Sequence, residues 1–417
     1  MPSLPPSPSF RRPSVSILTE SPRRRVIPPS PGFPAVPAWL AQRLRAAGGS
    51  VPFLDYMDWA LHDPDHGAYG SGRLQIGPGG DFATAPSLGE EFARLLAPQV
   101  AQWLALLPAD ESLTLVETGP GEGQLAQQLA EALHTGWPSL AGRTELVLVE
   151  PNAGMAERQR HRLASCPLPV RWADLRTLAD APRRGVVLAH EVLDALAVER
   201  IERRGEGWCR QRVVLEDDGL RLEAGEPVSG AMLASLADLG LLPLDGRRPE
   251  GWCSELHPGL APWLAACAGA LAQGWLLVID YAHEARRYYA PQRSNGTLMA
   301  YRRQRASDDP LREPGQWDLT AHLCLESLEV AARAGGWQPQ GVCRQGEALL
   351  ALGLAQRLHG LQRESGTPLA QLLQRRETLL RLVDPAGLGE FRWIALRRDG
   401  EPPTPGMEPL FLSPPSV

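Results

Sequence analysis

The feature that most constrains the fold is a glycine-rich turn between a short apolar run and an amphipathic stretch. Residues 116–123 read "VETGPGEG", and the helical pattern "QLAQQLAEALH" follows directly. Glycines permit positive φ angles and let a ligand approach the backbone. In open α/β sheets, ligands bind at such turns, beyond the carboxyl ends of the strands. A plain tight turn is the alternative, so the surrounding pattern has to decide.

Short apolar runs alternate with helical segments along much of the chain, which predicts an α/β fold with a parallel sheet. The predicted strands are Leu113–Thr118, Glu145–Glu150, Val170–Asp174, Gly185–His190 and Gly274–His283, with a last strand at Phe391–Arg398. Residues 198–255 alternate polar and apolar positions around Gly and Asp-Gly turns, which predicts an inserted antiparallel meander. Residues 286–317 read as a polar loop region, and "AHLCLESLEVAARAGG" reads as a helix with a glycine stop.

These patterns divide the chain into four parts. Residues 1–37 are rich in Pro, Ser and Arg and are interpreted as a disordered tail. Residues 38–110 form a predicted N-terminal helical lobe, and residues 111–400 form the sheet domain with its insertion. Residues 401–417 are Pro-rich and are predicted to be a flexible C-terminal tail.

Composition excludes several classes of protein. A net charge of −6 argues against nucleic-acid binding, which needs a surplus of cations. The chain has no lysine, so a P-loop and a Schiff-base mechanism are both excluded. Its six cysteines are scattered without a C-x-x-C pair, so neither a disulfide framework nor a metal site is predicted. No apolar run approaches the roughly 20 residues of a membrane helix, so no membrane insertion is expected.

The cysteines and the N-terminus also bear on location. Residues 1–37 lack the apolar region of a secretory signal, and their Arg and Ser content is similar to that of a transit peptide. Their many prolines would disrupt the amphipathic helix of such a peptide. With unpaired cysteines, which suit a reducing compartment, the sequence predicts a cytoplasmic location.

The glycine spacing indicates the ligand. The third glycine comes one residue earlier than in the dinucleotide fingerprint G-x-G-x-x-G, which weakens a dehydrogenase hypothesis. S-adenosylmethionine fits better, with its amino-acid end on the loop, its ribose on Glu150 after the second strand and its adenine near Asp174 after the third. Asp174 could instead be a helix N-cap. The predicted cofactor-binding residues are Glu117, Gly119, Pro120, Gly121, Gly123, Glu150, Asp174 and Leu175.

A set of motifs carries a family resemblance. "YMDWALHDPDHGAYG", "GDFATAP", "ETGPGEGQL", "HEVLDALAVER", "SELHPG", "VIDYAH", "GTLMAYRR" and "DLTAHLCLESL" occur in this order. Together they resemble the MidA-type methyltransferases, class I enzymes that use S-adenosylmethionine. The resemblance implies a Rossmann-like sheet and this cofactor. Mitochondrial members are complex I assembly factors that methylate a protein arginine, so the resemblance also implies a protein substrate, with a complex I-like subunit as the candidate.

An arginine acceptor needs carboxylates that orient its guanidinium. Glu191 and Asp194, just after the fourth strand, are the leading candidates, although they could simply be a charged helix start. Asp318 and His322 are spaced one helical turn apart and could close the acceptor side of the pocket, or Asp318 could cap that helix. His62 and His66 flank a turn-rich segment and are interpreted as local structure.

Two other hypotheses remain open from the sequence. One is a methyltransferase that acts on a small molecule, and the other is a non-catalytic assembly chaperone that retains the cofactor fold. Turnover separates the chaperone from a methyltransferase, because a chaperone would bind its partner without releasing S-adenosylhomocysteine.

Overall fold

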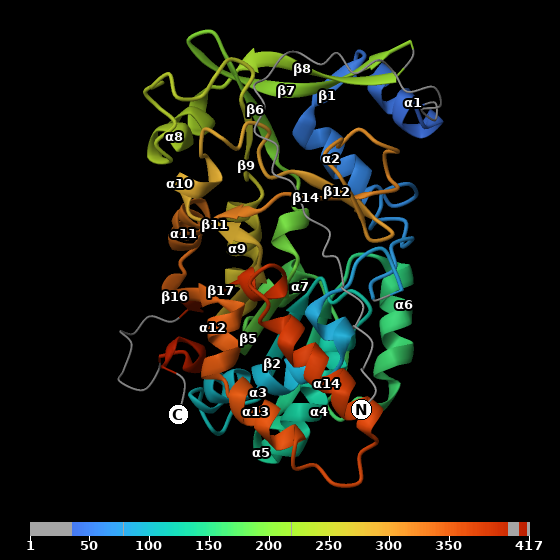
Figure 1. The fold of residues 1–417 in the computed structure, drawn as a ribbon, viewed down its shortest axis with the longest axis vertical. Helices are drawn as coiled ribbons and strands as arrows, with labels where there is room; N and C mark the ends of the chain where they lie inside the picture. The colour runs from blue at the N-terminus through green and yellow to red at the C-terminus, as the bar shows by residue number, and fades with distance from the viewer. Residues whose placement is uncertain (1–35, 78, 218, 399–407, 415–417) are drawn as a thin grey trace, which may run out of the picture. The chain divides into compact units, whose positions relative to one another are not determined.

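A seven-stranded mixed sheet lies at the centre of the protein (Figure 1). The computed structural model describes residues 36–77, 79–217, 219–398 and 408–414. The sheet order is β16-β17-β10-β5-β2-β3-β4. Its strands are β2 (Leu113–Thr118), β3 (Thr144–Val149), β4 (Val170–Trp172), β5 (Arg183–His190), β10 (Leu271–Asp280), β16 (Gln338–Arg344) and β17 (Arg392–Arg398). The predicted α/β class is confirmed, and each predicted strand of this sheet is present.

The chain enters this sheet in the middle. From β2 it builds outward through β3 and β4, and then crosses to β5 on the other side of β2. The strands β4, β3, β2, β5 and β10 are parallel, whereas β17 runs antiparallel to β10, and the edge strand β16 runs antiparallel to β17. The strand order therefore reverses between β2 and β5, which opens a crevice beyond their carboxyl ends.

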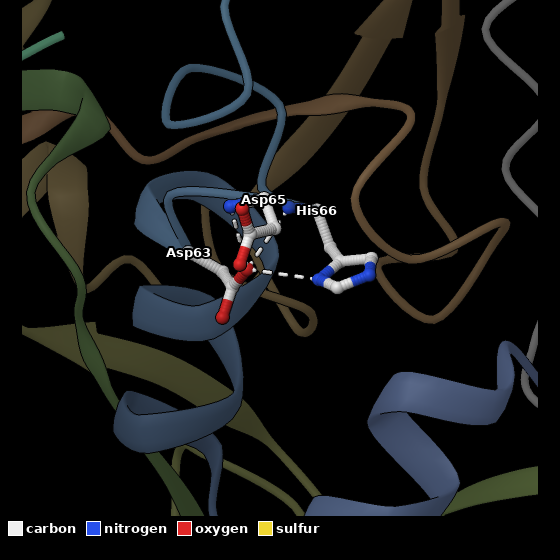
Figure 2. Close-up of side chains that lie close together, drawn as sticks. All are labelled: Asp63, Asp65 and His66. Atoms are coloured by element: carbon white, nitrogen blue, oxygen red, sulfur yellow. Dashed lines mark hydrogen bonds and ion pairs between the residues drawn. The ribbon is translucent and has the colours of Figure 1, made fainter.

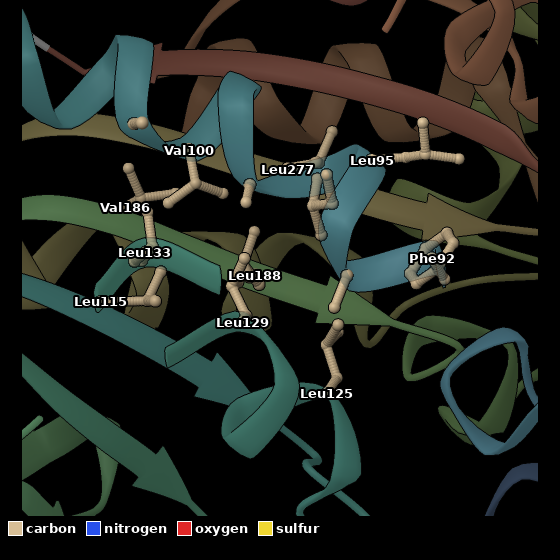
Figure 3. Close-up of a cluster of buried hydrophobic side chains, with 14 of the residues drawn as sticks. Phe92, Leu95, Val100, Leu115, Leu125, Leu129, Leu133, Val186, Leu188 and Leu277 are labelled. Carbon is tan, nitrogen blue, oxygen red and sulfur yellow. The ribbon is translucent and has the colours of Figure 1, made fainter. Parts of the chain in front are cut away.

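Helices cover both faces of the sheet because its strands are apolar on both sides. In β10, Leu277 and Ile279 join one core cluster, and Leu276 and Val278 join the other. Figure 3 shows the first cluster, where α3 and α4 side chains meet those of β2, β5 and β10. The first face is covered by α3 (Glu91–Ala105), α4 (Gln124–Gly136), α12 (Gln345–Ala351), α13 (Leu354–Leu361) and α14 (Leu369–Leu382). The second is covered by α7 (Leu175–Ala179), α9 (Leu260–Ala270) and α11 (Leu325–Ala334).

Shorter elements complete this part of the chain. They are α5 (Pro138–Ala141), α6 (Ala153–Arg162), α10 (Ala285–Tyr288) and the 3-10 turns η1 (Ala85–Leu88), η2 (Leu163–Ser165), η3 (Leu193–Ala195) and η4 (Leu388–Glu390). Among the described residues, no helix combines the length and apolar character that crossing a bilayer requires.

The predicted meander is a second, antiparallel sheet, seen at the top of Figure 1. It contains β6 (Glu199–Arg204), β7 (Gly207–Glu216), β8 (Gly219–Pro227) and β9 (Cys253–Leu256), with α8 (Gly230–Asp238) before β9. A strand from the N-terminal segment, β1 (Ser50–Pro52), also pairs with β7.

The predicted helical lobe at 38–110 is therefore corrected. Helices α1 (Ala38–Ala46) and α2 (Phe53–His62) pack with the inserted sheet, in a core that joins Phe53 to Val198 and Val213. Helix α3 packs on the central sheet instead. Residues 38–110 are thus divided between two hydrophobic cores. Helical periodicity alone does not show which core a helix packs into.

The helix predicted around residues 318–336 begins later than expected. Asp318–Thr320 forms β14, and Leu323–Cys324 forms β15, so α11 starts only at Leu325. β14 pairs with β12 (Met299–Arg302), which also pairs with β13 (Arg305–Ser307), and β15 pairs with β11 (Ala282–His283). Strand pairing overrides the helical spacing here and gives structure to the predicted polar loop region at 286–317.

The C-terminal prediction is wrong for residues 408–414. The turn η5 (Leu410–Leu412) inserts Phe411, which is 2% exposed, between Trp103 and Trp393. The Phe411 N–H donates to the Gln99 side-chain oxygen at 3.2 Å. Aromatic burial therefore docks this segment. The predicted N-terminal tail lies outside the described residues, except for Val36 and Pro37.

Candidate active site

The glycine loop between β2 and α4 has the predicted left-handed backbone. Gly119, Gly121 and Gly123 have φ angles of 59°, 52° and 75°. A Cβ on Gly119 would lie 2.8 Å from Cγ2 of Val192, and one on Gly121 would lie 2.8 Å from Cδ1 of Ile76. The loop is thus closely covered by protein side chains. Positive φ favours glycine at both positions, and at Gly119 the branched Val192 side chain also leaves no room for a Cβ.

A cavity of about 550 Å³ opens beside this loop, at the switch point of the sheet. Its lining includes Glu117, Gly119, Pro120, Gly121, Glu150, Asp174, Leu175 and Glu191. The structure thus places seven of the eight predicted cofactor residues around one cavity, together with one predicted catalytic residue. Gly123 is the exception: it is the N-cap of α4 and does not line the cavity.

Glu117 ends β2 and is 4% exposed. Burial raises the pKa of its carboxyl to about 8, and only the backbone N–H of Ala126 opposes this shift. Its Oε2 atom is buried and has no hydrogen-bond partner among the described residues. A buried carboxyl without a partner is costly, so this oxygen is suited to a donor supplied by a ligand.

Glu150, after β3, is held by two donors. Its Oε1 accepts from the N–H of Asn152 at 2.8 Å, and its Oε2 accepts from Nε2 of Gln159 at 3.1 Å. Gln159 also donates to the carbonyl of Gly121 and accepts from the indole of Trp172. Gln159 therefore ties the glycine loop, Glu150 and β4 together. Sequence reasoning missed it, because nothing in a surface-type helix marks a buried glutamine.

Asp174 caps α7, as the alternative interpretation held. Its Oδ1 accepts from the N–H of Thr177 at 2.6 Å, and this bond lowers the pKa of the carboxyl. The same side chain lines the cavity. Capping and ligand contact are compatible, because one carboxylate oxygen can remain open to the cavity.

Glu191 follows β5 with a backbone φ of 53°, which is strained for a residue with a side chain. Its N–H donates to the carbonyl of Ile279 at 2.9 Å, which fixes the turn. Its Oε1 lies 3.4 Å from Nδ1 of His190. Burial lowers the pKa of His190 to about 3, so this imidazole is neutral and supplies no charge.

Four carboxyl groups converge here: Glu191, Asp194, Asp280 and Asp318. Burial raises the pKa of Glu191 well above its ordinary value, and Asp194, Asp280 and Asp318 raise it further. Burial likewise raises the pKa of Asp194, and that of Asp318 to about 8. Among the described residues, Asp194, Asp280 and Asp318 have no ion pair, so no basic side chain of the protein neutralises the group.

Backbone donors hold this carboxyl cluster in place. Oδ2 of Asp280 accepts from the N–H groups of Leu193 and Asp194, and Oδ1 accepts from that of Tyr281. Asp318 is hydrogen-bonded to the phenol of Tyr69. The carbonyl of Asp194 accepts from the N–H of Ala321, which joins η3 to β14. The cluster therefore belongs to a rigid frame of turns, and the predicted charged helix start at Glu191 and Asp194 is a single 3-10 turn.

The predicted pairing of Asp318 with His322 is wrong. His322 points to a different group, where its Nδ1 lies 3.2 Å from Nε2 of His283 and its ring stacks on Tyr281 at 5.2 Å. Burial and His283 lower the pKa of His322 to about 3. These two residues are not on one helix face, because strand pairing in β14 separates their side chains.

The N-terminal segment supplies cavity residues that the sequence did not predict. His62 and Tyr69 both line the cavity, and Nε2 of His62 lies 3.3 Å from the carbonyl of Ala195. His66 does have the predicted local role. Figure 2 shows it with Asp63 and Asp65 in the turn after α2.

Asp63 is fully engaged in that turn. Its Oδ1 accepts from the N–H groups of Asp65 and His66 and lies 3.1 Å from Nδ1 of His66. Its Oδ2 pairs with Arg43 at 2.6 Å. The Asp63 carboxylate therefore serves the structure of this loop.

Comparison with curated proteins points to one activity. The chain is 27% identical over 387 residues to "Protein arginine methyltransferase NDUFAF7 homolog, mitochondrial" from Drosophila melanogaster, covering 86% of this chain and 84% of that protein. It is also 27% identical to the Homo sapiens protein of the same kind, covering 84% of this chain and 80% of that protein. These relatives are named as mitochondrial proteins, so the predicted cytoplasmic location is wrong.

A solved structure and a family model agree with this result. A protein from Burkholderia thailandensis, crystallised with S-adenosyl-homocysteine, is 30% identical, with a TM-score of 0.78, covering 91% of this chain and 95% of that chain. A family model of S-adenosyl-L-methionine-dependent methyltransferases matches residues 95–343, more than half of the 417 residues. The chain therefore belongs to this family of S-adenosyl-L-methionine-dependent methyltransferases.

Proposed function

We propose that this enzyme methylates the guanidinium group of an arginine in a protein. The observation that carries the proposal is the carboxyl cluster of Glu191, Asp194, Asp280 and Asp318, which is buried and has no cationic partner among the described residues. Like charges in a buried site repel one another, and a bound cation relieves this repulsion. A planar guanidinium suits several carboxylates at once, because its five N–H donors form a fixed fork.

The cofactor residues fit S-adenosylmethionine. In this proposal the unpartnered Oε2 of Glu117 takes up the cofactor's amino group, and the Glu150 carboxylate accepts from its ribose hydroxyls. Asp174 and Leu175 contact the adenine end. When bound, S-adenosylmethionine supplies an activated methyl group on its sulfonium sulfur.

The chain's own residues position the acceptor. Glu191 lines the cavity from a fixed turn, so its carboxylate orients the guanidinium beside the reacting methyl. Asp194 is the second carboxylate and takes up the proton that the methylated nitrogen loses, at a carboxylate oxygen. Burial shifts its pKa upward toward neutrality, which suits a proton acceptor at physiological pH.

Asp318 has a supporting role in this scheme. Its hydrogen bond with Tyr69 connects the carboxyl cluster to the N-terminal segment that closes the cavity. His322 takes no part, since it is engaged with His283 and Tyr281.

The names of the relatives support a protein acceptor, since both matched proteins are called protein arginine methyltransferases. The motif resemblance makes a subunit related to complex I the first acceptor to test. Purified enzyme, S-adenosylmethionine and the candidate subunit are incubated, and released S-adenosylhomocysteine is measured while mass spectrometry locates methylarginine. Methylation of lysine or of a small amine instead, or partner binding without S-adenosylhomocysteine release, would reject the proposal.

A further inference from the structure

A second cavity, of about 520 Å³, is lined by immediate chain neighbours of active-site residues. Tyr69 and Ile76 line the active-site cavity, whereas Ala68 and Gln75 line the second one. In the small sheet, Tyr301 of β12 pairs directly with Asp318, and the next residue, Arg302, lines the second cavity. The two cavities therefore share a wall formed by the N-terminal segment, and β12 borders the second cavity.

The turn that borders the second cavity is strained. Arg302 pairs with Arg305, so Arg303 and Gln304 form a two-residue β-hairpin turn, with φ angles of 47° and 58°. Such turns favour Asn-Gly, because both central residues adopt left-handed conformations. A long side chain at each position costs on the order of 1 kcal/mol or more.

Asp81 holds the turn in this conformation. Its Oδ1 accepts from the N–H of Arg303 at 3.1 Å, and its carbonyl accepts from the N–H of Gln304 at 2.7 Å. Its Oδ2 accepts from the N–H of Gln75 at 3.1 Å. A strained turn fixed from outside in this way keeps the Arg303 side chain at the cavity, and stored strain of this kind is typical of functional sites.

The charges at this cavity are mainly positive. Its lining contains Arg73, Arg302 and Arg303 but a single carboxylate, Asp81, whose two oxygens both accept backbone N–H groups. Arg302 pairs with Glu313. Within the described ranges, Arg73 and Arg303 have no ion pair; Arg73 donates only to the carbonyl of Asp65, at 3.1 Å.

We propose that this second cavity binds an acidic side chain of the same polypeptide whose arginine enters the active site. The inference rests on the proposed protein-arginine acceptor. The unpaired guanidiniums of the second cavity attract a carboxylate, and the carboxyl cluster of the active site attracts a guanidinium. The two cavities together therefore select an acceptor that carries an arginine and a nearby acidic residue. Since consecutive Cα atoms are about 3.8 Å apart, an acidic residue a few positions from the target arginine can reach across the shared wall.

The test compares two short synthetic peptides with one central arginine, flanked either by glutamates or by glutamines. For the wild type, we expect kcat/KM for the glutamate peptide to be about tenfold higher, from two partly exposed charge pairs. The double variant Arg73→Gln/Arg303→Gln should lose this preference while turning over the glutamine peptide at the wild-type rate. Arg305→Gln is the matched control, because it removes an exposed charge from the same hairpin at a residue that does not line the cavity.

A binding measurement separates this inference from the proposed function. Rhodamine-labelled versions of both peptides, with citrulline replacing arginine, cannot be methylated and need no carboxyl cluster. If wild type binds the glutamate version more tightly and the double variant does not, the acidic subsite stands even when no arginine peptide is turned over. Three results would each overturn it: equal binding of both versions, an unchanged preference in the double variant, and an equal loss of preference in Arg305→Gln.

Discussion

Glu191→Gln tests the acceptor site most directly, because it keeps the side-chain shape and removes one charge. Glu191 lines the cavity, and its Oε1 has no hydrogen-bond partner among the described residues, so this oxygen is available to a substrate, and a bound guanidinium favours its charged form. Losing one charge-assisted contact in the transition state lowers methyl transfer about 100-fold, or about 2.7 kcal/mol. Asp194, Asp280 and Asp318 remain, which keeps the loss from being total.

Cofactor affinity should hardly change in this variant. The predicted cofactor contacts, Glu117 and Glu150, lie at the carboxyl ends of β2 and β3, whereas Glu191 follows β5. The assay measures S-adenosylhomocysteine release with the acceptor protein, alongside calorimetry with S-adenosylhomocysteine alone. Glu90→Gln is the control, since Glu90 pairs with Arg94 on an exposed helix surface.

Two outcomes would refute this reasoning about Glu191. Wild-type turnover in the variant would move the orienting role to Asp194 or Asp318. Loss of S-adenosylhomocysteine binding would instead make Glu191 a cofactor contact.

Four further changes test other parts of the structure. Glu150→Ala should weaken S-adenosylhomocysteine binding by about 2–4 kcal/mol in calorimetry, since a charge-assisted hydrogen-bond pair is lost; unchanged affinity would rule out the ribose contact. Gly121→Val should abolish cofactor binding in a folded protein, because its Cβ would meet Ile76 at 2.8 Å in a backbone with φ of 52°; unchanged affinity would place the cofactor elsewhere. The pKa of Asp318 is raised to about 8, so between about pH 4 and 8 the unfolded chain releases a proton that the folded chain keeps, and the stability of the wild type falls as pH rises. The melting temperature of Asp318→Asn, measured relative to that of the wild type, should therefore increase from pH 5 to pH 8. A difference that stays constant over this range would contradict the prediction. Phe411→Ala should cost about 3–5 kcal/mol of unfolding free energy in denaturant titration, and a loss below 1 kcal/mol would mean that the segment is not docked.

The inner strands of the central sheet were predictable because they are short apolar runs, which makes the signal local, whereas the edge strand β16 is only partly buried and was not predicted. The glycine loop was predictable for a similar reason, since its position after β2 follows from the order of residues alone. Glu150 and Asp174 then followed from the order of the strands, and the structure places both at the same cavity as the loop.

The acceptor side was harder to predict because it depends on pairing between distant segments. The spacing of Asp318 and His322 fits a helix, yet β14 pairs with β12 and places Asp318 opposite Tyr301. Tyr69 reaches the same carboxyl group from a segment about 250 residues earlier in the chain. No local pattern encodes either contact.

The carboxyl cluster also explains why the site is built from so many separate turns. Mutual repulsion would push Glu191, Asp194 and Asp280 apart unless the backbone held them. The N–H groups of Leu193 and Asp194 donate to Asp280, and the N–H of Ala321 donates to the carbonyl of Asp194; these bonds keep the carboxyl groups together at a cost in stability. A cation that binds only the folded state recovers part of that stability. An arginine acceptor should therefore raise the melting temperature of the enzyme more than its citrulline counterpart does, since the two differ mainly in charge.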